Sequence, residues 1–331
     1  MFPSLTLLRM YKYTGIDISK QTFDASITTD KGVVSKKINH DEAGFSKLLK
    51  LLPVDAHVVM EASGPYYYRL AFFLHQHQVR VSVVNPLVIR RFCQMRMVRT
   101  KTDKKDAAMI REYGLTENPA MWQPDPPMIT KLKQLNAALD LLDKHITSSN
   151  NQLEAFEQMP DADAYTLERL QHTIKENKQV RDQLEQEMEK VMQQHYRQTY
   201  QALRSIPGIG PKSAAMLIAI SGNFTKFSCY RQLVAYIGLN PRVFESGTSV
   251  KGKGNISKMG TARLRKLLYL CSWSAKKYNA QCKEMYVRLK AKAKPERVIK
   301  IAIANKLLRQ AFAVGKNLTN YKQNYQPTFA F

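Results

Sequence analysis

The chain has 331 residues, of which 44% are hydrophobic and 9% aromatic, and this composition excludes a disordered polypeptide. No apolar run is long enough to cross a bilayer, which excludes an integral membrane protein. The formal net charge is +24, and so basic a chain is typical of proteins that bind a polyanion, with nucleic acid as the first expectation.

The first 115 residues have the pattern of an α/β domain. Apolar runs predict strands over 13–19, 23–38 (two strands around a turn at 30–32), 57–64 and 79–86. Helical patterns lie between and after them, over 41–52, 66–75, 86–97 and 104–113. Three successive strands followed by strand–helix alternation predict a mixed sheet covered by helices.

The middle of the chain has the pattern of a helical hairpin with heptad character. Apolar residues recur at steps of three and four from Met128 to Ile146 and resume from Leu167 to Val191, with a break at 160–166. The seam also contains polar residues, Asn177 and Arg181 among them. The hairpin is therefore either an internal spacer or an arm that joins copies of the chain, and the pattern leaves both open.

Positive charge is concentrated in the last third of the chain. This part is predicted to be helical with glycine-rich joints, and to contain two or three basic helices over 261–318. Residues 1–130 carry 18 basic and 12 acidic residues, residues 131–200 carry 9 and 12, and residues 201–331 carry 24 and 3. We expect this last third to bind nucleic acid. An anionic membrane surface is the alternative, but no basic amphipathic helix with aromatic anchors stands out.

Four acids near the start form a candidate metal site. Asp17 lies in the first predicted strand, Glu61 ends the apolar part of another, and Asp103 and Asp106 share one face at the start of a predicted helix. A carboxylate on a buried strand is costly unless a cation compensates it. Two hard cations about 3.5–4 Å apart would do so, and would clamp a phosphodiester during in-line displacement. We expect Mg²⁺, with Mn²⁺ as a substitute.

A structural reading of the same acids stays open. Each could be a solvated strand end or a helix cap, and the dipeptide Thr102–Asp103 is a good capping sequence. For Asp17, in mid-strand, that reading explains little.

The segment LRSIPGIGPKSAAML (203–217) is typical of a helix–hairpin–helix joint. Gly208 and Gly210 would let the backbone approach a phosphate at the start of the following helix, with Lys212 beside it. Such a joint contacts nucleic acid independently of sequence. An ordinary tight turn between two helices is the alternative.

The segment 238–260 is predicted to be a phosphate-binding loop. It is rich in glycine and hydroxyl side chains, and its candidate phosphate ligands, together with one at the start of the next helix, are Arg242, Lys251, Lys253, Lys258 and Arg263. A serine becomes a phosphoryl-transfer nucleophile only where its hydroxyl is activated and cations meet the phosphate charge. Spacing does not identify which hydroxyl, if any, has that role. No serine lies in a nucleophile elbow, which argues against a Ser–His–Asp hydrolase.

Cysteine usage indicates a reducing compartment. The chain's four cysteines show no paired short spacing, which argues against a zinc site and against a disulfide framework. The first ten residues carry too little positive charge ahead of their apolar part to form a secretion signal. We therefore expect a cytoplasmic protein without a membrane partner.

Five stretches together resemble one family over nearly the whole chain. They are GIDISK (15–20), VVMEASGPYY (58–67), RTKTDKKDA (99–107), IPGIGPKSAAMLIAIS (206–221) and the long run from GLNPRVFESG (238–247) to RKLLY (265–269). Their order and spacing resemble the DEDD transposases of the insertion-sequence "one-ten" family, which are related to Piv-type site-specific DNA invertases.

This resemblance implies a RuvC-like, RNase H-type metal domain at 1–125, a coiled-coil arm at 126–202 and a basic transposase domain at 203–331. It places the family's acidic tetrad on Asp17, Glu61, Asp103 and Asp106. The family's catalytic serine is the serine of the pattern Pro-x-x-x-x-Ser-Gly, which here runs from Pro241 to Gly247 and places that serine at Ser246. It also implies a bacterial or archaeal, nucleoid-associated protein, recombination guided by a structured bridge RNA, and a homo-oligomer, dimer or tetramer, formed through the arm.

The sequence therefore predicts a Mg²⁺-dependent DNA transposase that uses Ser246 as nucleophile on donor and target DNA. A junction-resolvase-like nuclease would use the same acids with water as nucleophile. A non-catalytic nucleic-acid-binding scaffold is the third reading.

Overall fold

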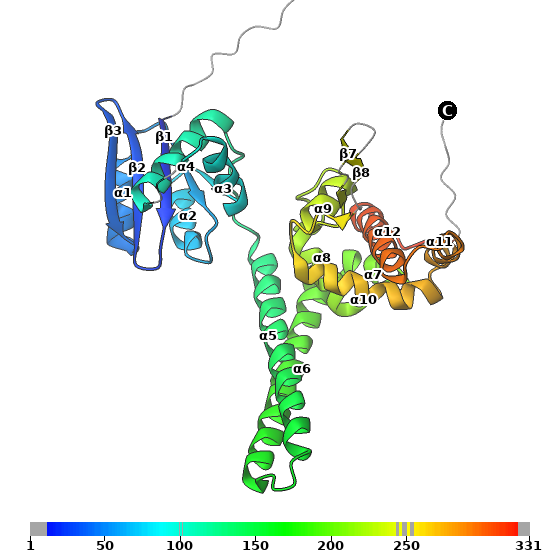
Figure 1. The fold of residues 1–331 in the computed structure, drawn as a ribbon. Helices are drawn as coiled ribbons and strands as arrows, with labels where there is room; N and C mark the ends of the chain where they lie inside the picture. The colour runs from blue at the N-terminus through cyan, green and yellow to red at the C-terminus, as the bar shows by residue number, and fades with distance from the viewer. Residues whose placement is uncertain are drawn as a thin grey trace, which may run out of the picture. The chain divides into compact units, whose positions relative to one another are not determined.

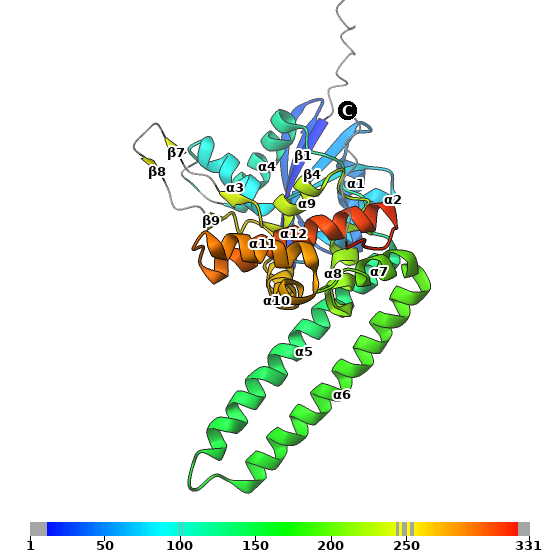
Figure 2. The ribbon, with the colours of Figure 1, turned by 90° about the vertical axis from the view of Figure 1, so that its right-hand side faces the viewer.

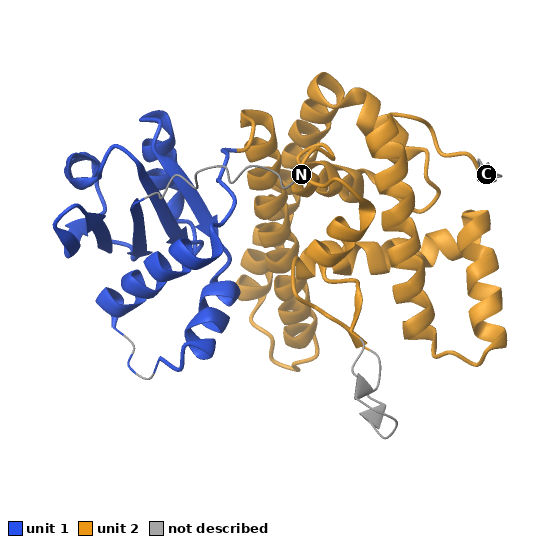
Figure 3. Ribbon diagram, turned by 90° about the horizontal axis from the view of Figure 1, so that it is seen from above, with its two compact units in different colours: residues 1–124 blue, residues 125–331 orange. Residues whose placement is uncertain are grey.

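A computed structural model describes residues 12–98, 100, 102–242, 245–246, 250–251 and 255–323, with the backbone alone at 245, 246, 250 and 251. The chain divides into two compact units, residues 1–124 and residues 125–331 (Figure 3). Within the described ranges, no helix combines the length and the apolar character needed to cross a membrane.

Unit 1 is a five-stranded mixed sheet with helices on both faces (Figure 1). The strands are β1 (Lys12–Ile18), β2 (Thr22–Thr29), β3 (Gly32–Asn39), β4 (Ala56–Glu61) and β5 (Arg80–Val84). They lie in the order β3-β2-β1-β4-β5, with β1, β2 and β3 antiparallel to one another in turn and β1, β4 and β5 parallel. The helices are α1 (Glu42–Leu51), α2 (Tyr67–Gln76), α3 (Pro86–Met95) and α4 (Asp103–Glu117).

The two faces of this sheet have separate cores because side chains alternate along each strand. Ile16, Val58 and Met60 pack with α1 and α2, in a cluster that includes Phe45 of α1 and Leu70 of α2. Tyr13 and Val59 point to the other face, where they pack with Ile89 of α3 and Ile110 of α4. The face with α3 and α4 is therefore the one to which residues 13, 15 and 17 of β1 point.

Gly15 lets α4 lie directly on β1. A Cβ at this position would come within 2.2 Å of the backbone oxygen of Ala107 and the backbone nitrogen of Arg111. Any larger residue would push the helix away from the strand. Gly15 thus sets how closely the start of α4 approaches the carboxyl end of β1.

Unit 2 is mostly helical. Its helices are α5 (Pro127–Glu157), α6 (Ala164–His195), α7 (Arg197–Arg204), α8 (Pro211–Ser221), α9 (Tyr230–Ile237), α10 (Ala262–Tyr278), α11 (Ala280–Ala291) and α12 (Glu296–Asn317). Among the residues that the structure describes between α9 and α10 are four two-residue strands. Of these, β6 (Pro241–Arg242) pairs with β9 (Asn255–Ile256), and β7 (Glu245–Ser246) pairs with β8 (Val250–Lys251).

The helices α5 and α6 form a long hairpin that is rooted in the body of unit 2 (Figure 2). Leu132, Leu139 and Val191, at the root, belong to one continuous core with α7 to α12. Toward the tip, Ile146 and Ile174 are buried. The predicted apolar seam is thus buried where the two helices pack on each other and on the unit's body.

The mixed sheet with helices at the start of the chain and the mostly helical remainder confirm the coarse part of the expected fold class, while the coiled-coil arm and the helix–hairpin–helix element stay predictions. The helix predicted from residue 104 begins one residue earlier and runs to Glu117. The break predicted at 160–166 overlaps the turn between α5 and α6, which spans 158–163, so that α6 begins inside the predicted break. The helix α9 has eight residues and carries too short a pattern to be recognised in advance.

Candidate metal centre

The neighbouring parallel strands β1 and β4 place Asp17 and Glu61 side by side. Ile16 is in register with Met60, so the next residue of each strand, Asp17 and Glu61, lies at the carboxyl end of the pair. Both side chains point to the face covered by α3 and α4, as the alternation requires. Both are partly buried.

The start of α4 supplies the other two acids. Thr102 is the N-cap, and its hydroxyl accepts a hydrogen bond from the backbone N–H of Lys105. Asp103 is the first helical residue, so the capping role belongs to Thr102 and not to the Asp103 carboxylate. Asp106 follows one turn later on the same face.

A cavity of about 780 Å³ brings the four acids together: Asp17, Glu61, Asp103 and Asp106 all line it. Its opposite wall is α3, which contributes Arg90 and Gln94 among others. The sequence pattern had predicted that these four acids share one metal site, although it placed Asp17 in mid-strand. It had not identified the wall formed by α3.

The surroundings of Asp17 are unfavourable for its ionised carboxylate in the absence of a cation. Burial, followed by repulsion from Asp106, Asp103, Glu61 and Asp24, raises the pKa of Asp17 to about 6. No described cation forms an ion pair with Asp17. A bound divalent cation would remove this penalty.

The donor set fits a hard divalent ion held in part by its substrate. Carboxylate oxygens are the ligands that Mg²⁺ and Mn²⁺ prefer. Among the described side chains, no three His, Cys, Asp or Glu groups are close enough to form a complete protein cage. Mg²⁺ is usually bound through one or two carboxylates, with water and substrate phosphates completing its shell, so the arrangement suits such an ion.

Two further features of the cavity were not predicted as site residues. The Ser63 hydroxyl donates a 2.6 Å hydrogen bond to the Glu61 carboxylate and so orients it. Leu87, Arg90 and Gln94 recur at steps of three and four on α3 and line the cavity. That spacing is visible in the sequence and shows that the three residues share one face of α3. It does not show that this face lines the cavity, because that depends on how the helix packs on the sheet.

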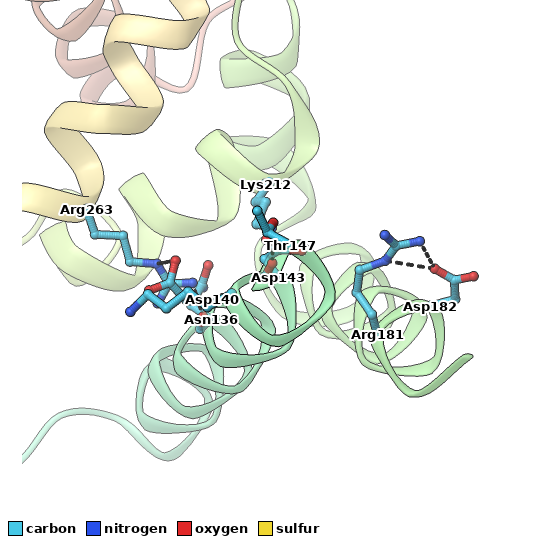
Figure 4. Close-up of polar contacts among 9 residues, drawn as sticks. Asn136, Asp140, Asp143, Thr147, Arg181, Asp182, Lys212 and Arg263 are labelled. Atoms are coloured by element: carbon cyan, nitrogen blue, oxygen red, sulfur yellow. Dashed lines mark hydrogen bonds and ion pairs between the residues drawn. The ribbon is translucent and has the colours of Figure 1, made fainter. Parts of the chain in front are cut away.

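Two of the predicted nucleic-acid ligands in unit 2 contact the hairpin (Figure 4). The Lys212 ammonium, on α8, pairs with Asp143 of α5. Arg263, on α10, lies 3.2 Å from Asp140 and also donates to the backbone oxygen of Asn136. Phosphate binding by Lys212 and Arg263 stays a prediction, and each would have to share its charge with these carboxylates.

The glycine-rich joint forms the turn between α7 and α8. Gly208 has φ +106°, and a Cβ there would come within 2.8 Å of Ala275, so it packs tightly on α10. Gly210 is the N-cap of α8 and faces open space. The joint thus connects two helices, and both its identity as a helix–hairpin–helix element and its contact with nucleic acid stay predictions.

The remaining predicted residues lie in and around the loop 238–260. Arg242, in β6, and Lys258, which follows β9, are exposed. Ser246 and Lys251 lie in the paired strands β7 and β8, but their side chains are outside the described part of the structure. Lys253 lies wholly outside the described residues.

Comparison with known proteins identifies the family. A model of DEDD transposases of the IS110 type matches residues 14–157, and a model described as "Transposase IS116/IS110/IS902 family" matches residues 200–287. The chain is 31% identical to the pilin gene-inverting protein of Moraxella lacunata over 310 residues, which cover 91% of this chain and 95% of that protein. The chain belongs to the IS110 family of DEDD transposases.

Other members of the IS110 family are similar over most of their length. A transposase of the insertion element IS1328 from Yersinia enterocolitica is 26% identical, over 94% of this chain and 97% of that protein. A transposase of IS1111A from Coxiella burnetii is 25% identical, over 78% and 76%. Membership makes unit 1 an RNase H-like DEDD domain and the chain a DNA phosphoryl-transfer enzyme that binds DNA and depends on a divalent metal ion.

Proposed function

We propose that this protein is the recombinase of an insertion sequence and that it cleaves and exchanges DNA strands at the four-carboxylate cavity of unit 1. The observation that supports this site is the convergence of Asp17, Glu61, Asp103 and Asp106 on one cavity, with no cation paired to Asp17 in the described part of the chain. The family's name for its acidic motif agrees with that set.

The chain's own residues would divide the work as follows. Asp17 and Glu61, fixed by the rigid ends of β1 and β4, would hold Mg²⁺, with Asp103 and Asp106 completing the set from α4. Ser63 would keep the Glu61 carboxylate oriented. When bound, Mg²⁺ would polarise the scissile phosphate and stabilise the leaving oxygen.

The metal role of the acids is tested by substitution without loss of shape. We expect Glu61→Gln and Asp106→Asn to lower Mg²⁺-dependent cleavage of element-end DNA by at least about 100-fold, the usual effect of removing one charge-stabilising group. Asp24→Asn is the matched control, because Asp24 neighbours Asp17 across the sheet but does not line the cavity. Full activity of both cavity variants would refute the metal site.

The nucleophile is proposed separately and is assigned to Ser246. Its Oγ would form a bond to the DNA phosphorus as the bond to the leaving DNA oxygen breaks; the serine loses its proton and the leaving oxygen gains one. The resulting phosphoserine would survive denaturation. The Pro-x-x-x-x-Ser-Gly pattern and the basic residues around it support this assignment.

Denaturing gels distinguish this route from hydrolysis by water. A labelled DNA substrate should remain covalently attached to the denatured wild-type protein. The Ser246→Ala variant should form no such adduct. Cleavage by Ser246→Ala at the wild-type rate, without an adduct, would instead make the protein a metal-dependent nuclease of the junction-resolvase kind.

Three further features of the family pattern are kept as proposals. Residues 126–202 would act as an arm. Residues 203–331, which carry most of the positive charge, would bind nucleic acid. That part would bind a guide (bridge) RNA as well as DNA. The hairpin would join copies of the chain through outward residues such as Leu141 and Tyr165, which are 53% and 69% exposed. Sedimentation analysis of Leu141→Glu against wild type tests the last point.

A further inference from the structure

A second cavity, in unit 2, is lined by cations and an aromatic ring. It has a volume of about 500 Å³, and Lys258, Arg265, Lys266, Arg297 and Tyr269 line it. None of the described residues that line it is acidic. A concave site with this lining suits an anion.

Three of these cations are not committed to the fold. Lys258, Lys266 and Arg297 are exposed, and none forms an ion pair with a described residue. Arg265, by contrast, donates to the backbone oxygens of Ile237 and Gly260 and so holds the cavity wall in place. The cavity therefore combines a fixed wall with free positive charge at its rim.

An aromatic and basic face of α10 continues from the cavity. Lys266, Tyr269, Trp273 and Lys276 follow one another at steps of three and four, which places them on one face of the helix. Trp273 is 51% exposed although indole is the side chain that gains most from burial. The helix thus presents a large aromatic surface next to a cationic cavity.

The helix α12 fixes that indole in place. The Lys300 ammonium, on a side chain only 7% exposed, lies 3.5 Å from the centroid of the Trp273 ring, a cation–π contact. Glu296 lies 3.1 Å from Lys276 and 3.5 Å from Lys300 and partly neutralises them. Trp273 is therefore held as a rigid platform, and the free charge lies toward the cavity.

We propose that the cavity and the Trp273 face of α10 form a binding track for an unpaired polynucleotide, whose phosphate enters the cavity while a neighbouring base stacks on Trp273. The proposal deepens, and rests on, the nucleic-acid role of unit 2. A groove of cations beside exposed aromatic rings is the general solution for binding single strands. A duplex keeps the faces of its bases stacked on one another and offers none to Trp273.

The cavity is tested by binding in EDTA, with the full-length protein and labelled oligothymidylate, oligouridylate and a mixed-sequence DNA duplex. The double variant Lys266→Ala/Arg297→Ala should bind both single strands more weakly and reduce the slope of log K against log salt by about 1 to 2. The matched control, Lys175→Ala/Lys178→Ala, removes the same charge from exposed positions of α6. Equal binding by the two double variants would overturn the proposal.

The platform is tested through its own fluorescence. The chain has two tryptophans, so Trp122→Phe leaves Trp273 as the sole indole. Both single strands should quench its emission saturably, and the duplex should not. Trp273→Leu should weaken single-strand binding by about 5- to 100-fold, and Trp273→Phe by less, because a smaller ring still stacks. Unquenched emission in the presence of bound single strand would overturn the stacking.

Two outcomes distinguish this proposal from the metal site. The binding measurements contain no metal, so they would give the same result if the proposed cleavage activity were wrong. Conversely, failure of single-strand binding at Trp273 would not affect the cleavage tests of Glu61 and Asp106. A preference for oligouridylate would make RNA the occupant, and a preference for oligothymidylate would make it single-stranded DNA. Quenching by the duplex equal to that by single strands would contradict the proposal.

Discussion

Two partly buried aspartates, one in each unit, show opposite electrostatic designs. Asp17 in unit 1 faces other carboxylates, and burial together with their repulsion raises its pKa to about 6. Burial also acts to raise the pKa of Asp125 in unit 2, but hydrogen bonds from Lys133 and Lys226 outweigh it and lower that pKa. Asp125 is therefore paired with two lysines, whereas no described cation forms an ion pair with Asp17.

This difference separates acids that serve structure from acids that serve binding. Each buried charge without a partner reduces the stability of the protein, so it is retained only where something else benefits. Asp17 is such a charge, and three further carboxylates line the same cavity in a family that depends on a divalent ion, which supports the proposed metal site. Four substitutions test this difference between the two units.

The largest effect is expected at Gly15, which brings the acids of α4 to β1. Gly15→Val should cost about 3 kcal/mol or more of unfolding free energy, because its side chain would collide with the backbone of α4. Urea denaturation measures the loss. Gly210→Ala is the control, since a Cβ there meets open space. An equal loss for the two variants would contradict the close packing of α4 on β1.

Asp17→Asn should stabilise the metal-free protein. Because the folded pKa lies above the ordinary value of 3.8, ionised Asp17 destabilises the fold at pH values above about 6. The gain should be on the order of 2 kcal/mol at pH 8 in EDTA and should vanish as the pH falls toward 4. Thermal melts across this range measure it. Added Mg²⁺ should stabilise the wild type and not the variant; a gain that is independent of pH would refute this account.

Asp125→Asn should act in the opposite direction. A lowered folded pKa means that the pair with Lys133 and Lys226 stabilises the protein above pH 4 and is lost as the pH falls further. We expect a loss of about 1–2 kcal/mol at neutral pH, moderated because both lysines are partly exposed. The same melts compare it with Asp17→Asn, and a stabilising effect would remove the contrast between the two units.

The smallest effect is expected at Lys212, which pairs with the middle of α5. Lys212→Met should cost less than about 1 kcal/mol, because its pair with Asp143 is partly exposed and screened by salt. If Lys212 also contacts phosphate, Lys212→Met should bind DNA more weakly than Lys144→Met. Lys144 is an exposed lysine of α5 that pairs with Asp140. Equal DNA binding by the two would assign Lys212 to the fold.

Much of unit 1 could be predicted because its elements have a short-range cause. The β2–β3 turn, the Thr102 cap and the apolar strands are each encoded within a few neighbouring residues. Asp17 and Glu61 were predicted to share a metal site because a carboxylate on a buried strand is costly without a cation, and not because the strands were known to be neighbours. Their identity as a set also depended on the resemblance to a family and not on spacing alone.

Other features depend on contacts that no local pattern contains. The wall formed by Arg90 and Gln94 depends on which face of α3 meets the sheet. Lys212 was predicted to lie beside a phosphate, and its pair with Asp143 comes from a residue 69 positions away. The exposure of Trp273 is likewise a tertiary property, because its helix pattern equally predicts a buried ring.

The anchoring of the hairpin has a mechanical consequence. The helix α5 is about 46 Å long at 1.5 Å per residue, and near its middle Asp140 and Asp143 join it to α10 and α8. The part of the hairpin beyond Asp143 is a rod held at one end, and such a rod is a lever. A partner that pulls sideways on its tip would therefore load these two ion pairs first, and the torque would reach the helix that carries Trp273.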